Sequence, residues 1–407
     1  MTRTFAILGA GPAGATAAAT LREEGFDGRV VLIGEEQRSP YERPPLSKEY
    51  LRGEYGVDDL WLRPAGWFEE QDIEFLSGTR ATRLDVAGRG IELSSGERVG
   101  FDRALLATGS RNRPIDVPGR DLPGVLDLRR IADADRIRER VQAGARVAVV
   151  GMGFIGAEVA ASLRQMGSGV EVVEPLETAM FRVLGPELGR VVETIHRDHG
   201  VRMRFGEAVD RFEGSRDVEA LVTSSGRRVT CDFAVVGVGV QPNVELAEQA
   251  GLPAPNGIAV DAALRTASPD VFAAGDVALH DHPLFGPLRV EHHDNALKMG
   301  QAAARNMLGA PTPFDDPHWF WSDQYDVNIQ VAGVAQSFDE VIIRGAIEDR
   351  SFSAFLLREG QLLSVVGVNR PRDVRRAMAL IRAGARPDAA SLRDETVDLR
   401  TLAPVAR

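Results

Sequence analysis

The sequence predicts an α/β protein of three parts, because two long segments repeat one design and the last part of the chain differs from both. The segments "TFAILGAGPAGATAAATLREEG" at 4–25 and "RVAVVGMGFIGAEVAASLRQMG" at 146–167 each hold an apolar strand, a G-x-G-x-x-G turn and an Ala-rich helix. Near residue 316 the pattern changes to aromatic and β-branched strands followed by an Arg-rich helix. We therefore expect two Rossmann-like dinucleotide-binding domains and a C-terminal α+β domain.

The boundaries follow from where strands leave and re-enter each domain. "LLATGS" at 105–110 ends the first domain and "DFAVVGVGVQPN" at 232–243 ends the second, whereas "TASPDVFAAGDVA" at 266–278 returns to the first. The second domain is thus predicted to be inserted into the first. We expect the first dinucleotide-binding domain at 1–113 and 240–315, the second at 114–239 and an α+β domain at 316–407.

The composition excludes several classes of protein. The chain has 407 residues, 44% hydrophobic and 26% charged, which is ordinary for a globular protein. No run of 18 apolar residues occurs, and a net charge of −11 argues against nucleic-acid binding. A strand that begins by Phe5 leaves no room for a signal peptide, so we expect a cytoplasmic protein with no membrane contact.

The chain contains one cysteine, Cys231, in the strand-like run "RVTCDFAVVGVGV". A single cysteine excludes an internal disulfide and a CxxC redox pair. We expect Cys231 to be a small buried apolar residue.

Each glycine of the first turn has a separate task. Gly9 permits the tight turn, Gly11 lets the backbone approach a pyrophosphate, and Gly14 lets the helix pack on the strand. The helix N-terminus then offers free N–H groups to the phosphates. Glu35, which we place at the end of the next strand, "RVVLIGE", is expected to accept hydrogen bonds from ribose hydroxyls.

The second copy repeats this arrangement with Gly151, Gly153, Gly156 and Glu174. Glu174 would repel a 2′-phosphate and the following "PLET" offers no cation, so NADH is favoured over NADPH. Two nucleotide sites in one chain suggest a bound cofactor that accepts electrons and a diffusible nicotinamide.

The order G-x-G-x-x-G, "ATG", G-x-G-x-x-G and "GD" resembles the two-dinucleotide-domain flavoproteins of the glutathione reductase type. Within that group, "PYERPPLSK", "FIGAE", "EHHDNAL" and "FWSDQY" are most similar to FAD-dependent NADH:ferredoxin reductases of oxygenase systems, such as putidaredoxin reductase and biphenyl dioxygenase ferredoxin reductase. These motifs span nearly the whole chain.

The resemblance implies a set of cofactor contacts. The first glycine turn would hold the AMP half of FAD, Gly275 and Asp276 its ribitol, and Arg43 its pyrophosphate or ribose. Further residues that it assigns to FAD are Pro12, Ala13, Ala81, Ala107, Thr108, Gly109, Arg129, His293, Ala296 and Trp321. Ile155, Glu158 and Gly239 join the second glycine turn and Glu174 in the NADH site.

The loop "RPPLSK" carries the residues that the resemblance makes catalytic. It places Lys48 beside flavin N5 and pairs it with Glu158 of the second glycine motif. A buried lysine needs a partner to stay charged, and a cation near N5 favours the negative charge that hydride transfer brings. The prolines stiffen the loop.

Several histidines lie near the predicted flavin site. His293 stands where relatives place Trp or Val, so its role stays open between hydrogen bonding, tuning of the potential and simple packing. Asp294 is predicted to cap the helix "NALKMGQAAARNML". His280, His282 and His292 lack a cysteine partner or a ligand pattern, so no metal is expected.

The resemblance implies an acidic [2Fe-2S] ferredoxin as partner. It also implies that Trp321, Ser322, Asp323 and Gln324 line the flavin and the entry for this electron acceptor, with ordinary core aromatics as the alternative for this stretch. Six arginines against one acid in the stretch Arg370–Arg386 offer a basic docking patch, or else an ordinary solvated helix face. We expect a monomer or a homodimer.

The function predicted is NADH:ferredoxin oxidoreduction for a P450 or a Rieske oxygenase. A reductase of rubredoxin or another carrier is an alternative, and so is an NADH-sensing flavoprotein like apoptosis-inducing factor. NADH oxidases, peroxidases and CoA-disulfide reductases need a cysteine near the flavin, where this chain has Leu46, Ser47 and Lys48.

Overall fold

The computed structural model describes residues 3–309 and 311–402 and divides into two compact units. Unit 1 comprises Met1–Glu42, Asp58–Arg111 and Gln241–Phe320. Unit 2 comprises Arg43–Val57, Asn112–Val240 and Trp321–Arg407. The loop that carries Lys48 therefore groups with the second glycine motif and the C-terminal segment. The three-domain boundaries drawn from the sequence stay a prediction.

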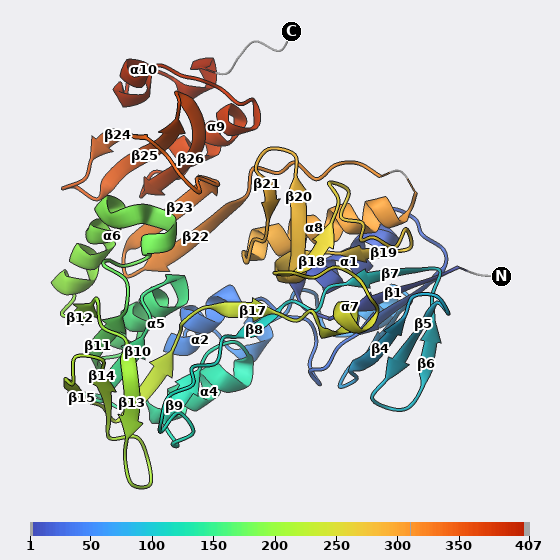
Figure 1. The fold of residues 1–407 in the computed structure, drawn as a ribbon, viewed down its shortest axis with the longest axis horizontal. Helices are drawn as coiled ribbons and strands as arrows, with labels where there is room; N and C mark the ends of the chain where they lie inside the picture. Colours follow the sequence, from blue (N-terminus) through green and yellow to red (C-terminus); the bar gives the residue numbers. More distant parts are fainter. Residues whose placement is uncertain (1–2, 310, 403–407) are drawn as a thin grey trace. The chain divides into compact units, whose positions relative to one another are not determined.

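Unit 1 is built on a five-stranded parallel sheet with the order β19-β7-β1-β2-β3 (Figure 1). Its strands are β1 Thr4–Leu8, β2 Arg29–Ile33, β3 Ile73–Leu76, β7 Arg103–Leu106 and β19 Val271–Ala273. The central strands are continuous apolar runs because helices or loops cover both faces of a parallel sheet. The strand β19 pairs with β7 of this sheet, although it follows the second glycine motif in the sequence. The predicted insertion of one domain into the other is therefore confirmed.

Two Ala-rich helices pack together in unit 1, α1 Pro12–Glu23 and α8 His293–Met307. A Cβ on Gly300 would lie 2.3 Å from the Ala13 carbonyl oxygen, so the helices approach closely only because that position is glycine. The smaller elements of unit 1 are η2 Val57–Leu60, α3 Trp67–Glu70, β4 Ala81–Asp85, β5 Gly90–Leu93, β6 Arg98–Gly100, α7 Glu245–Gln249, β18 Ile258–Val260, η3 Gly275–Val277, β20 Ala278–His282 and β21 Gly286–Leu288.

Unit 2 repeats the parallel design with the order β12-β11-β10-β16-β9. These strands are β9 Val125–Asp127, β10 Arg146–Val150, β11 Gly169–Glu174, β12 Arg202–Phe205 and β16 Phe233–Val236. Its helices are α4 Ile131–Arg140, α5 Phe154–Gln165 and α6 Phe181–Asp198, and α6 is kinked where Gly185 precedes Pro186. Shorter elements are η1 Pro44–Ser47, α2 Glu49–Arg52, β13 Val209–Glu213, β14 Ala220–Thr223 and β15 Arg228–Thr230. The strands β8 Ser110–Asn112 and β17 Val240–Pro242 each contain residues of both units.

The C-terminal part of unit 2 is a second sheet with the order β22-β23-β26-β25-β24 (Figure 1). The strands are β22 Trp319–Gln324, β23 Val327–Gly333, β24 Glu340–Ala346, β25 Ser351–Arg358 and β26 Gln361–Val368, followed by α9 Pro371–Arg382, α10 Ala389–Arg393 and η4 Leu399–Leu402. The α+β fold predicted here is confirmed, as is the Arg-rich helix. No helix of the described residues is both long and apolar enough to cross a membrane.

Three histidines of unit 1 pack among aromatic rings. The centroids of His280 and His282 lie 5.2 Å apart, and His282 lies 4.8 Å from His318, with Phe314 and Phe285 beside them. All three histidines are at most 3% exposed. No group of three or more His, Cys, Asp or Glu side chains suits a metal ion anywhere in the chain as described. The cluster is therefore best treated as part of the core.

These histidines predict an acid-sensitive fold. Burial lowers the pKa of His280 to about 4 and that of His318 to about 2, whereas an unfolded histidine titrates near pH 6.5. Below about pH 6.5 the unfolded chain binds more protons, so the free energy of unfolding falls as the pH drops towards 4. His318→Asn should flatten this decline, because it removes one titrating ring and Asn tolerates the φ of 58° at that position. Denaturant unfolding between pH 7.5 and 4.5 measures the slope, and an unchanged slope would contradict the assignment.

Candidate functional site

The first glycine turn is shaped by backbone contacts at its two outer glycines. Gly9 has a φ of 116°, and a Cβ there would lie 2.2 Å from the Ala107 carbonyl oxygen. A Cβ on Gly14 would lie 1.9 Å from the Gly9 carbonyl oxygen. A Cβ on Gly11, in contrast, would meet no atom within 4 Å. The middle glycine thus keeps open the space into which a pyrophosphate would fit.

The second turn has the same shape. A Cβ on Gly151 would lie 2.4 Å from the Gly237 carbonyl oxygen and one on Gly156 would lie 2.1 Å from that of Gly151, while Gly153 has nothing within 4 Å. The helices that follow, α1 and α5, have the glycine N-caps Gly11 and Gly153, so no N-cap side chain accepts a hydrogen bond from their first N–H groups. Their first N–H groups are therefore oriented to receive phosphate oxygens, which is what bound FAD and NADH require.

The acidic residues of the two copies are not equivalent. Gly9 N–H donates to the Ile33 carbonyl (2.9 Å) and Gly151 N–H donates to that of Val173 (2.8 Å). The next residue is Gly34 in the first copy and Glu174 in the second. A Cβ on Gly34 would lie 2.7 Å from that of Ala10, so a larger residue does not fit there.

Glu35 lies two positions after Ile33, whereas its counterpart Glu174 directly follows Val173. The expectation that Glu35 ends a strand is wrong. The strand β2 ends at Ile33, and Glu35 is exposed. Exposure leaves its carboxylate accessible, so the predicted contact to the FAD ribose stays a prediction.

Glu174 does more than the sequence suggests. It is 7% exposed, and its Oε2 accepts a hydrogen bond from the Met152 N–H at 2.6 Å while Oε1 accepts one from the Leu176 N–H at 2.9 Å. Met152 is the middle residue of the G-x-G turn. The carboxylate consequently holds the glycine turn in shape. Its role towards the NADH ribose stays a prediction.

The structure places several residues assigned to FAD next to one another in unit 1. A Cβ on Gly275 would lie 3.0 Å from the Cβ of Ala13 and 3.7 Å from that of Ala296. Asp276 Oδ2 accepts a hydrogen bond from Ser110 (2.7 Å). Thr108 Oγ1 donates to the Asn243 carbonyl (2.7 Å), next to the left-handed Gly109. Ala81 begins β4 and belongs to the same buried cluster as Ala13, Ala107 and Ala296.

The N-terminus of α8 differs from the prediction. The helix begins at His293 and its N-cap is His292, so the predicted capping role of Asp294 is wrong. Asp294 lies in the first turn and forms an ion pair with Lys298 (2.7 Å). Burial raises the pKa of Asp294 above its ordinary value. What His293 does towards a flavin stays open.

Unit 2 contains the ion pair between Lys48 and Glu158. Lys48 Nζ lies 3.2 Å from Glu158 Oε2, and each side chain is 5% exposed. The same carboxylate accepts hydrogen bonds from Ser47 Oγ (2.5 Å, on Oε2) and Ser322 Oγ (2.8 Å, on Oε1). The 3₁₀ turn η1, with its two prolines, presents Ser47 and Lys48 to α5.

Two other residues assigned to FAD also meet in unit 2. Arg43 donates from Nη1 to the Arg129 carbonyl at 2.5 Å. Trp321 lies on β22, where exposure alternates: Trp321 and Asp323 are partly exposed, whereas Ser322 and Gln324 are 0% exposed. Successive residues of β22 therefore point to opposite faces of the sheet. That the four residues line the flavin and the entry for the electron acceptor stays a prediction. Sequence reasoning missed the role of Ser322, although the alternation of a strand was the available signal.

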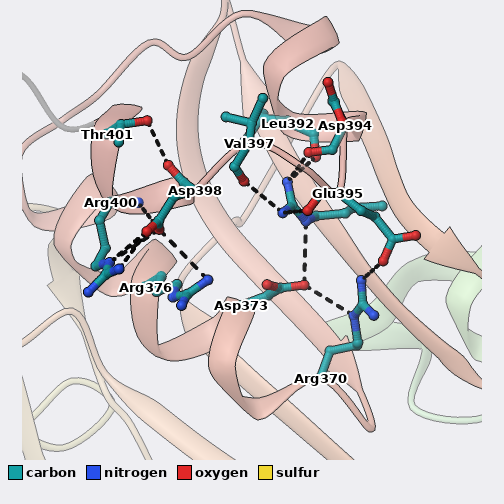
Figure 2. Close-up of polar contacts among 11 residues, drawn as sticks. Arg370, Asp373, Arg376, Leu392, Asp394, Glu395, Val397, Asp398, Arg400 and Thr401 are labelled. Atoms are coloured by element: carbon teal, nitrogen blue, oxygen red, sulfur yellow. Dashed lines mark hydrogen bonds and ion pairs between the residues drawn. The ribbon is translucent and has the colours of Figure 1, made fainter.

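The arginines of α9 are partly neutralised (Figure 2). Arg370 pairs with Asp373 and Glu395, and Arg376 lies 3.7 Å from Asp398. Arg344, 3% exposed, donates to carbonyls of the chain segment 392–397. The exposed arginines of the predicted patch are Arg372, Arg375 and Arg382 on α9 and Arg386 beyond it.

Cys231 is a free, buried thiol, as predicted, and burial raises its pKa to about 12. A thiol with that pKa is not a thiolate nucleophile at neutral pH. The site residues of unit 2 are therefore carboxylate, ammonium and hydroxyl groups.

Comparison with known proteins agrees with this geometry. Residues 3–300 match the family described as pyridine nucleotide-disulphide oxidoreductase. The chain belongs to that family. Residues 319–403 match a second family, described as reductase C-terminal.

Three similar proteins show the likeness over nearly full length. The anthranilate 1,2-dioxygenase system ferredoxin–NAD(+) reductase component of Burkholderia cepacia is 38% identical, over 98% of this chain and 98% of its own. The solved ferredoxin reductase for the CYP199A2 system of Rhodopseudomonas palustris is 40% identical, with a TM-score of 0.95 over 98% of this chain and 100% of its own. Putidaredoxin reductase in its covalent complex with putidaredoxin is 33% identical, with a TM-score of 0.95 over 98% of each chain.

The glycine turns predict a contrast between two small substitutions. Gly14→Ala should destabilise unit 1 by about 1–3 kcal/mol, because the new methyl group overlaps the Gly9 carbonyl. Gly11→Ala meets no atom and should leave the apoprotein as stable as the wild type, yet weaken FAD binding by crowding the pyrophosphate. Thermal unfolding of the apoprotein and titration with FAD separate the two effects. Equal stability losses, or full FAD affinity in Gly11→Ala, would contradict this account.

Proposed function

We propose that this protein is an NADH:ferredoxin oxidoreductase that holds FAD and delivers electrons to a [2Fe-2S] ferredoxin serving a P450 or a Rieske oxygenase. The observation that carries the proposal is the buried Lys48–Glu158 ion pair. Lys48 lies on the loop where thiol-using relatives have a reactive cysteine. The only cysteine of this chain is Cys231, whose buried thiol is inert.

The residues present fit the two cofactors. FAD, when bound, accepts a hydride from NADH and releases electrons one at a time, which makes a two-electron donor serve a one-electron carrier. The glycine turns before α1 and α5 would bind one dinucleotide each, and the uncapped N-termini of these helices would donate hydrogen bonds to the phosphates. Lys48, kept charged by Glu158, supplies positive charge to the redox reaction, and the rigid η1 turn keeps it in place.

NADH rather than NADPH is the proposed electron donor. Glu174 is an ionisable carboxylate at the end of β11, and the following residues 175–178 contain no cation that could pair with a 2′-phosphate. A buried carboxylate beside a phosphate dianion would be strongly unfavourable.

The proposed docking surface for the ferredoxin consists of Arg372 and Arg375 together with Trp321. Both arginines are exposed on α9, within a protein whose net charge is −11. A local basic patch on an acidic protein would steer an acidic partner to one face.

A cytoplasmic location is also part of the proposal, since the single cysteine is a free thiol.

The proposal predicts rapid NADH-driven reduction of a [2Fe-2S] ferredoxin from the same organism. The decrease in the visible absorbance of the ferredoxin measures this reduction. NADPH should be much less effective than NADH, because of Glu174. A rubredoxin in place of the ferredoxin tests the alternative carrier, and gel filtration with and without NADH tests the NADH-sensing alternative. Reduction of neither carrier, together with an NADH-dependent change in size, would overturn the proposal.

The docking surface predicts the outcome of charge reversal in the same assay. Arg372→Glu with Arg375→Glu should raise the KM for ferredoxin several-fold, and more at low salt, because exposed charges are screened at high ionic strength. The rate with ferricyanide should not change. Arg216→Glu, an exposed arginine of unit 2 outside α9, is the matched control. A similar rise in KM for the control would place docking elsewhere.

A further inference from the structure

A chain of hydrogen bonds continues from Glu158 deep into unit 2. Ser322 Oγ lies 2.8 Å from Glu158 Oε1, and Gln324 Nε2 lies 3.1 Å from Ser322 Oγ. Gln324 Oε1 lies 2.9 Å from His196 Nε2. His196 Nδ1 lies 3.2 Å from the hydroxyl of Tyr325. The chain therefore links β22 to α6, and its three middle members, Ser322, Gln324 and His196, are each 0% exposed.

The carboxylate of Glu158 at one end of the chain fixes which atom donates in every hydrogen bond. An ionised Glu158 can only accept, so Ser322 donates its hydroxyl proton to Oε1 and accepts from Gln324 Nε2. The Gln324 carbonyl then accepts from His196 Nε2–H. His196 Nδ1 is left as the acceptor of the Tyr325 hydroxyl.

This order requires a neutral His196 and a protonated Tyr325. Burial lowers the pKa of His196 to about 4, and the nearby His199 acts in the same direction. Burial also raises the pKa of Tyr325 above its ordinary value, although Arg164 opposes that shift. At neutral pH both groups are therefore in the form that the chain needs.

We propose that Ser322, Gln324 and His196 are positioning residues, a one-way chain of donors that keeps Glu158 ionised and oriented towards Lys48. None of the three needs to touch a cofactor. A hydrogen bond donated to a carboxylate favours its charged form, and each donor behind Ser322 orients the next. The effect on FAD reduction rests on the proposed function, whereas the chain itself does not.

Side chains of the loop 43–57 and of α5 surround the other oxygen of Glu158, Oε2. Lys48 and Ser47 approach Oε2, and Ser162 Oγ fixes Ser47 by donating to its carbonyl at 2.7 Å. Arg52 donates in turn to Ser162 at 3.3 Å. Lys48 is thus the charged group in contact with the carboxylate, and Oε1 depends on Ser322 for its hydrogen bond among the contacts described.

Gln324→Glu is the sharpest test, because it replaces one donor by an acceptor at nearly constant volume. The new carboxylate would draw the Ser322 hydroxyl away from Glu158 and would favour the imidazolium form of His196. NMR of the His196 ring in the full-length protein should show a pKa that rises by at least one unit from the wild-type value of about 4. An unchanged His196 titration would overturn the chain.

Ser322→Ala tests the end of the chain that contacts Glu158. The variant leaves Glu158 Oε1 without its described hydrogen bond, and a carboxylate that loses a donor takes up a proton more readily. The acid limb of the pH profile for reduction of bound FAD by NADH should therefore move to higher pH. Ser322→Thr keeps the hydroxyl and should restore the wild-type profile. Stopped-flow absorbance with NADH alone measures the rate without any ferredoxin.

Ser364→Ala is the matched control. Ser364 is a buried serine of β26 in the same unit, 3% exposed, and its hydroxyl donates to the Ala332 carbonyl at 2.9 Å. Its loss should lower stability and leave both the pH profile and the His196 titration unchanged. Equal shifts in Ser364→Ala and Ser322→Ala, or no shift in Ser322→Ala, would overturn the proposal. If NADH fails to reduce FAD in the wild type, the proposed function fails, and the His196 titration in Gln324→Glu still decides the chain.

Discussion

A carboxylate with 5% exposure is stable only where donors surround it, and Glu158 is the point at which this requirement shapes unit 2. Its two oxygens receive Lys48, Ser47 and Ser322, which come from a 3₁₀ turn and from the strand β22. Removing one partner of a buried ion pair typically costs about 3–5 kcal/mol, because the other charge stays in a medium of low polarity. The loop 43–57, the helix α5 and the C-terminal sheet are therefore held to one another by the group that also keeps Lys48 charged.

The repeated glycine turn supplies the second constraint. In each copy the outer glycines let strand and helix meet, and the middle glycine leaves space for a ligand. The copies differ in the residue that follows the second strand. Gly34 packs on Ala10 in the first copy, whereas Glu174 in the second folds back onto the Met152 N–H. The turn of the first copy is therefore held by packing, and the turn of the second copy by a hydrogen bond to a carboxylate. Only in the second copy does the shape of the turn depend on a charged side chain, Glu174.

Motifs with a fixed spacing were predictable from the sequence. The glycine turns, the return of β19 to the first sheet and the α+β nature of the C-terminal segment need only local pattern, and the Lys48–Glu158 pair followed from the likeness to a known family. Contacts that depend on side-chain direction were not predictable. His196 and Gln324 are 128 positions apart, and nothing in either segment alone indicates that they meet. The acidic partners of Arg370 and Arg376 were missed for the same reason, since Glu395 and Asp398 lie beyond α9 in the sequence.

The central claim is that positive charge at Lys48, held by Glu158, promotes the reduction of FAD by NADH. The most direct measurement is the limiting rate of that reduction in a stopped-flow instrument, for the wild type and for Lys48→Met loaded with the same amount of FAD. The account predicts a rate at least about tenfold lower in the variant, since one lost charge interaction of about 1.4 kcal/mol already produces that factor. Equal limiting rates with equal FAD content would contradict it.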